Sequence, residues 1–152
     1  MDVVKFLKSN KVKFALRHHP ARYTAQEVAA AEHITGEEVA KVVILKAEGC
    51  HAMCILPATC AVDMKKAKKA LGVGKVQLAG EDEIAGIFPD CEVGAMPPFG
   101  AEYDLQTYVD QRLAEDEKIL IPAGTHEDSV LLAWEDYKRL ARPKVADIAV
   151  HA

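Results

Sequence analysis

The fold is decided by the stretch Lys41-Val-Val-Ile-Leu-Lys-Ala-Glu-Gly-Cys-His-Ala-Met-Cys-Ile-Leu56. Its first half, Val42 to Leu45, is β-branched and continuously apolar, which is typical of a strand that is buried on both faces. Glu48-Gly49 is a turn signal, and a second apolar run follows from His51 to Leu56. The stretch therefore predicts two neighbouring strands, with Lys41 standing where a predicted helix gives way to the first of them.

Helical and strand patterns continue on both sides of this pair. We expect a strand at Val12 to His18, another at Lys75 to Ala79, and a hairpin formed by Lys118 to Pro122 and Ser129 to Ala133. Tyr103 to Val109 receives no assignment. The expected helices cover Val3 to Asn10, the segments after the capping boxes Thr24 to Glu27 and Thr35 to Glu38, and then Met64 to Leu71, Glu81 to Ile87 and Trp134 to Leu140.

About six strands mixed with about five helices, in no regular β-α alternation, predict a mixed α/β fold rather than a dinucleotide-binding one. The expected form is a mixed central sheet or a partly closed barrel of about six strands, flanked by helices. The chain has 152 residues, a length that suits one domain, so residues 1–152 are assigned to a single domain.

Composition and charge narrow the class of protein. Hydrophobic residues make up 50% of the chain and charged residues 28%, which is globular composition. No run approaches the length of a membrane span, and the first residues do not resemble a signal peptide, so we expect a cytoplasmic protein. The net charge of −4 does not by itself indicate nucleic-acid binding. Five lysines nevertheless lie close together in the sequence: Lys65, Lys66, Lys68, Lys69 and Lys75. They could bind a phosphate backbone, or they could form the solvated face of a helix.

The four cysteines are Cys50, Cys54, Cys60 and Cys91. Cys50, His51 and Cys54 could supply metal ligands, with Cys60 as a fourth. However, the segment also reads as a strand, and no second Cys or His pair completes a set. Structural cysteines are the favoured interpretation, and no metal or cofactor is expected.

Two features carry candidate chemistry. Lys41 could project a cation into a cleft, or it could simply extend its ammonium into water at the start of the strand. The segment Gly94-Ala-Met-Pro-Pro-Phe-Gly100 is stiff, which suits backbone N–H groups aimed at an oxyanion; the alternative is a rigid turn with Phe99 in the core. Gly124-Thr-His126 lies in a predicted turn, where its histidine is either a substrate contact or simply exposed.

Together these residues resemble the YbaK family of aminoacyl-tRNA deacylases, a domain type that also occurs as the editing insertion of bacterial prolyl-tRNA synthetases. The resemblance runs in order along nearly the whole chain. Its segments are His19-Pro20, Tyr23 to Ala29, Glu38 to Lys46, Leu56-Pro-Ala58, Val62-Asp63 with the lysine-rich helix, the G-x-x-x-P match at Gly94 to Pro98, and Gly124 to His126.

The resemblance implies hydrolysis of the ester that links an amino acid to the 3′ end of a mischarged tRNA, in trans. The implied substrate is a proline-type tRNA carrying Ala or Cys. Lys41 would hold the terminal adenosine, and Gly94, Ala95, Met96, Pro97 and Pro98 would cradle the carbonyl. Tyr23, Phe99, Gly100, Gly124, Thr125 and His126 would contact substrate, with Lys65, Lys66, Lys68 and Lys69 on the RNA.

The implied partners are aminoacyl-tRNA and an aminoacyl-tRNA synthetase, with no membrane. The alternative is an inactive module that binds tRNA or a synthetase.

Overall fold

The computed structural model describes residues 1–18 and 38–152 of the chain. Its helices are α1 (Val3–Ser9), α3 (Met64–Leu71), α4 (Glu81–Ile87) and α5 (Trp134–Ala141), with 3₁₀ turns η1 (Gly100–Tyr103) and η2 (Leu113–Glu115). Its strands are β1 (Phe14–His18), β2 (Ala40–Ala47), β3 (Cys50–Pro57), β4 (Cys60–Val62), β5 (Val76–Leu78), β6 (Gln106–Asp110), β7 (Lys118–Pro122), β8 (Asp128–Ala133), β9 (Lys144–Ala146) and β10 (Ala149–His151).

The predicted pair β2–β3 is the centre of the larger sheet. The two strands are antiparallel and in register from Ala40 opposite Pro57 to Ala47 opposite Cys50. The full order is β5-β2-β3-β6-β9, in which β5 is antiparallel to β2 while β6 and β9 run parallel to β3. The sheet is therefore mixed, as the sequence predicts.

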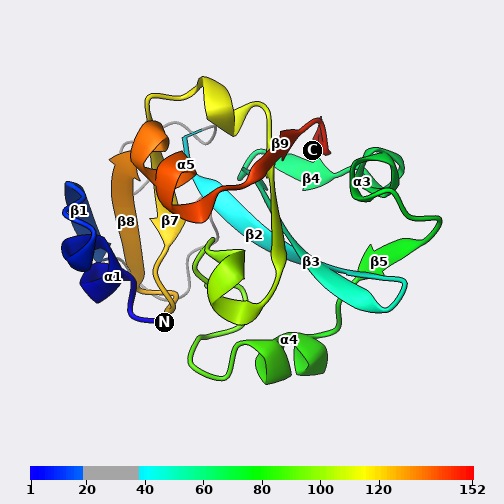
Figure 1. Cartoon of the computed structure of the whole chain (residues 1–152), viewed down its shortest axis with the longest axis horizontal. Helices are drawn as coiled ribbons and strands as arrows, with labels where there is room; N and C mark the ends of the chain where they lie inside the picture. Colours follow the sequence, from blue (N-terminus) through cyan, green and yellow to red (C-terminus); the bar gives the residue numbers. More distant parts are fainter. Residues whose placement is uncertain (19–37) are drawn as a thin grey trace.

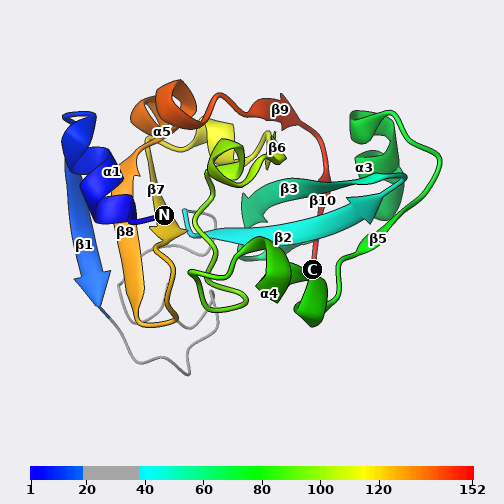
Figure 2. The same cartoon turned by 60° about the horizontal axis from the view of Figure 1, so that its bottom comes forward.

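A second sheet has the order β1-β8-β7 and contains the predicted hairpin. A parallel bridge between Val39 and Leu120 links it to the start of β2, where the N–H of Leu120 also donates to the carbonyl of Glu38 at 3.0 Å. Figures 1 and 2 show this sheet at one end of the molecule, with α3 and β5 at the other. The start of β2 is thus held where the two sheets meet.

The main core fills the space between the sheets. Alternation along β2 turns Ala40, Val42 and Ile44 toward it, together with residues of β7, β8 and α5. The opposite face of β2 contributes Leu45 to a smaller cluster under α3, which includes Cys54 and Ala67. Both faces of this strand are therefore largely covered, which explains its continuous apolar sequence.

Local signals at α3 act as predicted. The Asp63 side chain accepts from the N–H groups of Lys65 and Lys66, and Gly72 ends the helix in the left-handed region at φ 71°. The capping boxes at Thr24 and Thr35 and the helices expected after them lie outside the described residues.

Some expectations need correction. The described residues form ten strands rather than about six, because β4, β9 and β10 are short and β6 overlaps a segment whose pattern favours no assignment. The strand expected from Val12 begins at Phe14. The described strands lie in sheets of five, three and two strands and form no closed barrel, which leaves the mixed sheet as the observed form. No helix within 1–18 or 38–152 has the length and apolar character of a membrane span.

Candidate active site

Lys41 is the second residue of β2 and is half-buried. Its cross-strand partner is Leu56, and this face of the hairpin continues into the small cluster of Leu56, Cys60 and Ala149. Burial lowers the pKa of the Lys41 ammonium, and the Cys60 thiol acts in the opposite direction. No hydrogen bond or ion pair joins this ammonium to another of the described side chains. Lys41 is therefore a half-buried cation that no described side chain neutralises.

The loop from Gly94 to Gly100 contains no helix or strand until the 3₁₀ turn η1 begins at Gly100, and all of it except Gly94 is buried. Three of its backbone donors are used within the protein. Ala95 N–H donates to the carbonyl of Glu92 at 3.0 Å, Phe99 N–H to that of Pro97 at 2.9 Å, and Gly100 N–H to Thr107 Oγ1 at 3.1 Å.

The remaining donors of the loop are Gly94 and Met96, since Pro97 and Pro98 have no N–H. Gly94 N–H points to the Met96 sulfur at 3.0 Å, a weak acceptor. Met96 N–H has no partner within residues 1–18 and 38–152, although Met96 is only 2% exposed. A buried N–H without a partner is rare in folded proteins, so the N–H groups of Gly94 and Met96 are the loop's candidate donors for an oxyanion.

The turn Gly124-Thr-His126 packs directly on this loop. Gly124 N–H donates to Ala95 O of the loop at 2.9 Å, and Glu92 N–H, just before the loop, donates to Gly124 O at 2.8 Å. His126 Nε2 lies 2.7 Å from the carbonyl oxygen of Val93. Because a carbonyl only accepts, Nε2 carries the proton and donates.

Thr125 is occupied within its own turn, where its hydroxyl donates to Asp128 at 2.7 Å. The structure therefore brings the predicted loop and the predicted turn together, with His126 and Gly124 holding the loop by hydrogen bonds.

A second brace comes from α5 and the core. Tyr137 donates its hydroxyl proton to the Pro98 carbonyl at 2.7 Å in a buried site. Phe99 packs between Phe6 and Tyr137, with ring centroids 5.2 and 5.5 Å apart. Phe99 thus lies in the core, as expected if the loop is a rigid turn that anchors this side chain. At Gly100 a Cβ would overlap Thr107 Oγ1, so glycine is required by close packing rather than by φ.

Lys41 and the loop are related through the sheet junction rather than by direct contact. Ala40 and Val42, on either side of Lys41, pack in the same core as Met96 and Phe99. The Val39–Leu120 bridge fixes the start of β2 against β7, whose end leads to the turn at Gly124. Both features are therefore positioned by one junction, while Lys41 itself points from the other face of β2.

The other predicted residues are placed as follows. Lys66 is tied to Asp147 and to the carbonyl of Ala149, each at 3.0 Å, while Lys65 and Lys69 are exposed and Lys68 is half-buried. Tyr23 lies outside the described residues.

The four residues of the metal alternative are not gathered. Cys50 is exposed, Cys54 and Cys60 are buried, and His51 hydrogen-bonds Glu83 at 2.8 Å. Among the described side chains no three His, Cys, Asp or Glu groups are placed to share a metal ion.

Sequence reasoning missed two positioning groups, Tyr137 and Asp110. The helical pattern places Tyr137 correctly on α5, yet nothing in it indicates that the hydroxyl reaches Pro98. Asp110 is fully buried and accepts from the N–H groups of Ile148 and Ala149, each at 3.0 Å. The only available signal for Asp110 is an acidic residue at the end of an apolar run.

Comparison with known proteins agrees with this architecture. A family model described as an aminoacyl-tRNA editing domain matches residues 19–140. The chain is 27% identical over 153 aligned residues to the multifunctional Ser/Thr-tRNA deacylase ProXp-y of Escherichia coli (strain K12), covering 95% of this chain and 89% of the relative. It is also 27% identical to a proline–tRNA ligase of Bacillus mycoides (strain KBAB4), over 74% of this chain and 20% of the ligase.

Solved structures share the fold. A candidate trans-editing enzyme for prolyl-tRNA synthetase superposes with a TM-score of 0.86 over 98% of this chain and 95% of the other, at 20% identity. The hypothetical protein APE2540 superposes with a TM-score of 0.89 over 99% of this chain and all of the other, also at 20% identity. The curated deacylase and the matched family model agree with the expected enzyme class, a hydrolase of the deacylase type. The chain belongs to the aminoacyl-tRNA editing domain family, which confirms the YbaK-type resemblance.

Proposed function

We propose that this protein hydrolyses the ester bond between an amino acid and the 3′-terminal ribose of a mischarged tRNA, acting in trans. The observation that carries the proposal is the family match across residues 19–140, which includes both Lys41 and the Gly94 to Gly100 loop. The loop's geometry supports it, because the N–H groups of Gly94 and Met96 lack a strong acceptor among the described residues.

The reaction needs little from the protein beyond placement and charge. Water attacks the carbonyl carbon, the carbonyl oxygen becomes an oxyanion, and the N–H groups of Gly94 and Met96 stabilise that charge. The ester C–O bond then breaks, the ribose oxygen recovers a proton, and the amino acid leaves. Lys41 holds the terminal adenosine end as a compact cation. A ribose hydroxyl of the substrate assists the water, since the sequence offers no Ser-His-Asp or paired-carboxylate motif.

The proposed acyl group is a small amino acid, Ala or Cys on a proline-type tRNA. The relative named as a Ser/Thr-tRNA deacylase adds serine and threonine to the candidates. One methylene changes binding by only about 1–3 kcal/mol, so several small acyl groups are expected to react at different rates. An aminoacyl-tRNA synthetase is the proposed protein partner, in line with the match to a proline–tRNA ligase.

The test is a deacylation panel with tRNA-Pro charged with Ala or Cys and the matching tRNAs charged with Ser or Thr. Wild type should release at least one of these amino acids, and Lys41→Ala should reduce the rate by at least about 100-fold, which corresponds to about 2.7 kcal/mol of transition-state stabilisation. The matched control is Lys118→Ala, an exposed lysine at the start of β7, which should leave the rate unchanged.

Two outcomes would contradict this proposal in different ways. Equal hydrolysis by wild type and Lys41→Ala would remove Lys41 from the mechanism. Retention of aminoacyl-tRNA without release of the amino acid would make the domain a binding module instead. Circular dichroism of each variant shows whether a lost rate reflects a lost fold.

A further inference from the structure

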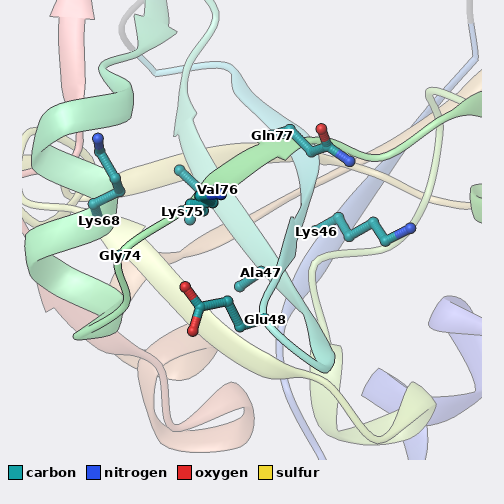
Figure 3. Close-up of a pocket in the computed structure, with 8 residues that line it drawn as sticks. All are labelled: Lys46, Ala47, Glu48, Lys68, Gly74, Lys75, Val76 and Gln77. Carbon is teal, nitrogen blue, oxygen red and sulfur yellow. The ribbon is translucent and has the colours of Figure 1, made fainter.

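A basic pocket that the site does not use lies at the far end of β2. Its volume is about 390 Å³, and it is lined by Lys46, Ala47, Glu48, Lys68, Gly74, Lys75, Val76 and Gln77. In Figure 3 Lys68 comes from α3, Lys75 and Gln77 come from the segment of β5, Lys46 comes from the end of β2, and Glu48 comes from the turn after it. Three segments that are separate in sequence thus converge on one hollow. The side chains of Lys46 and Gln77 point away from Lys68.

Some of the charged side chains in this pocket have an ion-pair partner among the described residues, and others have none. Lys46 is partly neutralised by Glu83, whose carboxylate lies 3.7 Å away. The Glu48 carboxylate lies against Gly74, where a Cβ would come within 3.3 Å of it. Lys68 and Lys75 have no carboxylate within ion-pair distance among the described residues, unlike Lys66, which is bonded to Asp147. The pocket therefore keeps two available cations, Lys68 and Lys75, and ammonium groups suit phosphate oxygens.

The pocket also has a fixed position relative to Lys41. Alternation along β2 puts Lys41, Val43, Leu45 and Ala47 on one face, and Ala47 lines the pocket. Ala47 is six residue steps beyond Lys41 along the strand, which is about 20 Å at about 3.3 Å per residue. An RNA whose 3′ end lies at Lys41 therefore reaches the pocket with nucleotides that precede that end.

We propose that Lys68 and Lys75 form a phosphate-binding subsite for the backbone of the tRNA acceptor end, away from the reacting ester. This inference rests on the proposed function, and it replaces a broad lysine face with one defined pocket. The subsite binds the sugar-phosphate chain without reading its sequence. It gives an acidic domain a local positive surface for an anionic substrate.

The experiment reverses two charges in the pocket and two elsewhere. Lys68→Glu/Lys75→Glu alters the subsite, and Lys5→Glu/Lys8→Glu is the matched control. Lys8 and Lys68 each lie in the last turn of their helix, and both double variants change the net charge equally. Figures 1 and 2 show α1 at the opposite end of the molecule from α3.

Binding of uncharged tRNA, followed by fluorescence anisotropy, tests the subsite without requiring hydrolysis. The pocket variant should bind at least about tenfold more weakly than wild type and the control variant, and its log-log salt slope should be smaller by about 1.5, as expected from the loss of two phosphate contacts. Equal affinities and slopes for the two double variants would overturn the subsite.

Hydrolysis then separates this inference from the proposed function. The pocket variant should have a raised KM on aminoacyl-tRNA but wild-type rates on aminoacyl-adenosine, which lacks the nucleotides that precede the 3′ end. If wild type hydrolyses neither substrate, the proposed function fails, while the anisotropy result still decides the subsite. Slow hydrolysis of aminoacyl-adenosine by the pocket variant would instead place these lysines in the reaction and contradict the inference.

Discussion

Gly94 occupies a backbone conformation that other residues adopt only with strain. Its φ is +92°, and a Cβ there would approach His126 Cε1 to 3.0 Å. Gly94→Ala should therefore destabilise the protein by about 1–3 kcal/mol. It should also lower the deacylation rate, because the N–H groups of Gly94 and Met96 would shift. Urea unfolding and single-turnover hydrolysis measure the two effects.

Gly86→Ala is the matched control for this prediction. Gly86 lies within α4, and a Cβ at this position would meet nothing within 4 Å, so alanine should stabilise by about 0.5–1 kcal/mol. A Gly94→Ala protein with wild-type stability and rate would show that the loop tolerates another backbone conformation.

At the scale of elements, the carboxylate of Asp110 fastens the end of the chain to β6. One oxygen accepts from the N–H groups of Ile148 and Ala149, and the other from the backbone and guanidinium of Arg112 at 3.0 and 3.3 Å. These bonds position β10 against β4, whose Cys60 lies near Lys41. These bonds of Asp110, called the Asp110 clamp below, therefore support the β4–β10 pair beside Lys41.

Asp110→Asn should cost about 3 kcal/mol, because an amide group would replace one acceptor in a fully buried site. Hydrogen exchange at the Ile148 and Ala149 amides should accelerate more than exchange in β2. Asp147→Asn is the control: this exposed partner of Lys66 should contribute less than about 1 kcal/mol. Similar losses for both variants would show that the buried clamp has no special role.

The sequence predicts elements well where periodicity and end signals agree. α3 has Asp63 and Gly72 at its ends, and β2–β3 has two apolar runs around Glu48-Gly49, so both appear as expected. The strands β4, β9 and β10 have three residues each, too few to show a period of two. Their pairing depends on distant contacts such as the Asp110 clamp, which no local pattern encodes.

At the scale of the whole molecule, the candidate site also combines features that local sequence predicts with features that depend on distant contacts. Lys41 and the Gly94 to Gly100 loop stand out locally, because a lysine beside a buried strand and two prolines between glycines are unusual. The Tyr137 hydroxyl on Pro98 and the Lys68–Lys75 pocket depend on segments that meet only in three dimensions. The sequence alone identifies the loop and Lys41 as candidates. The contacts that position the loop, such as the Tyr137 bond to Pro98, are visible only in the fold.

Burial of acidic side chains predicts how the whole protein responds to alkali. Burial raises the pKa of Cys54 from 9.0 to about 12, and burial also raises the pKa of Tyr137. A raised pKa means that the folded protein keeps a proton that the unfolded chain loses, so stability is complete below about pH 9 and falls as pH rises toward the folded value. The lowered pKa of Lys41 acts in the opposite direction, but it is one group against at least two.

Urea unfolding between about pH 8 and pH 11 should therefore show a falling free energy of unfolding, with each fully shifted group contributing at most about 1.4 kcal/mol per pH unit. Cys54→Ala loses packing and starts lower, yet its slope above about pH 9 should be shallower than that of wild type, since one titrating group is gone. Cys50→Ala, at an exposed cysteine, should keep the wild-type slope. An unchanged slope for Cys54→Ala would mean that the Cys54 thiol ionises as readily in the folded protein as in the unfolded chain, and that β3 is open to hydroxide despite its burial.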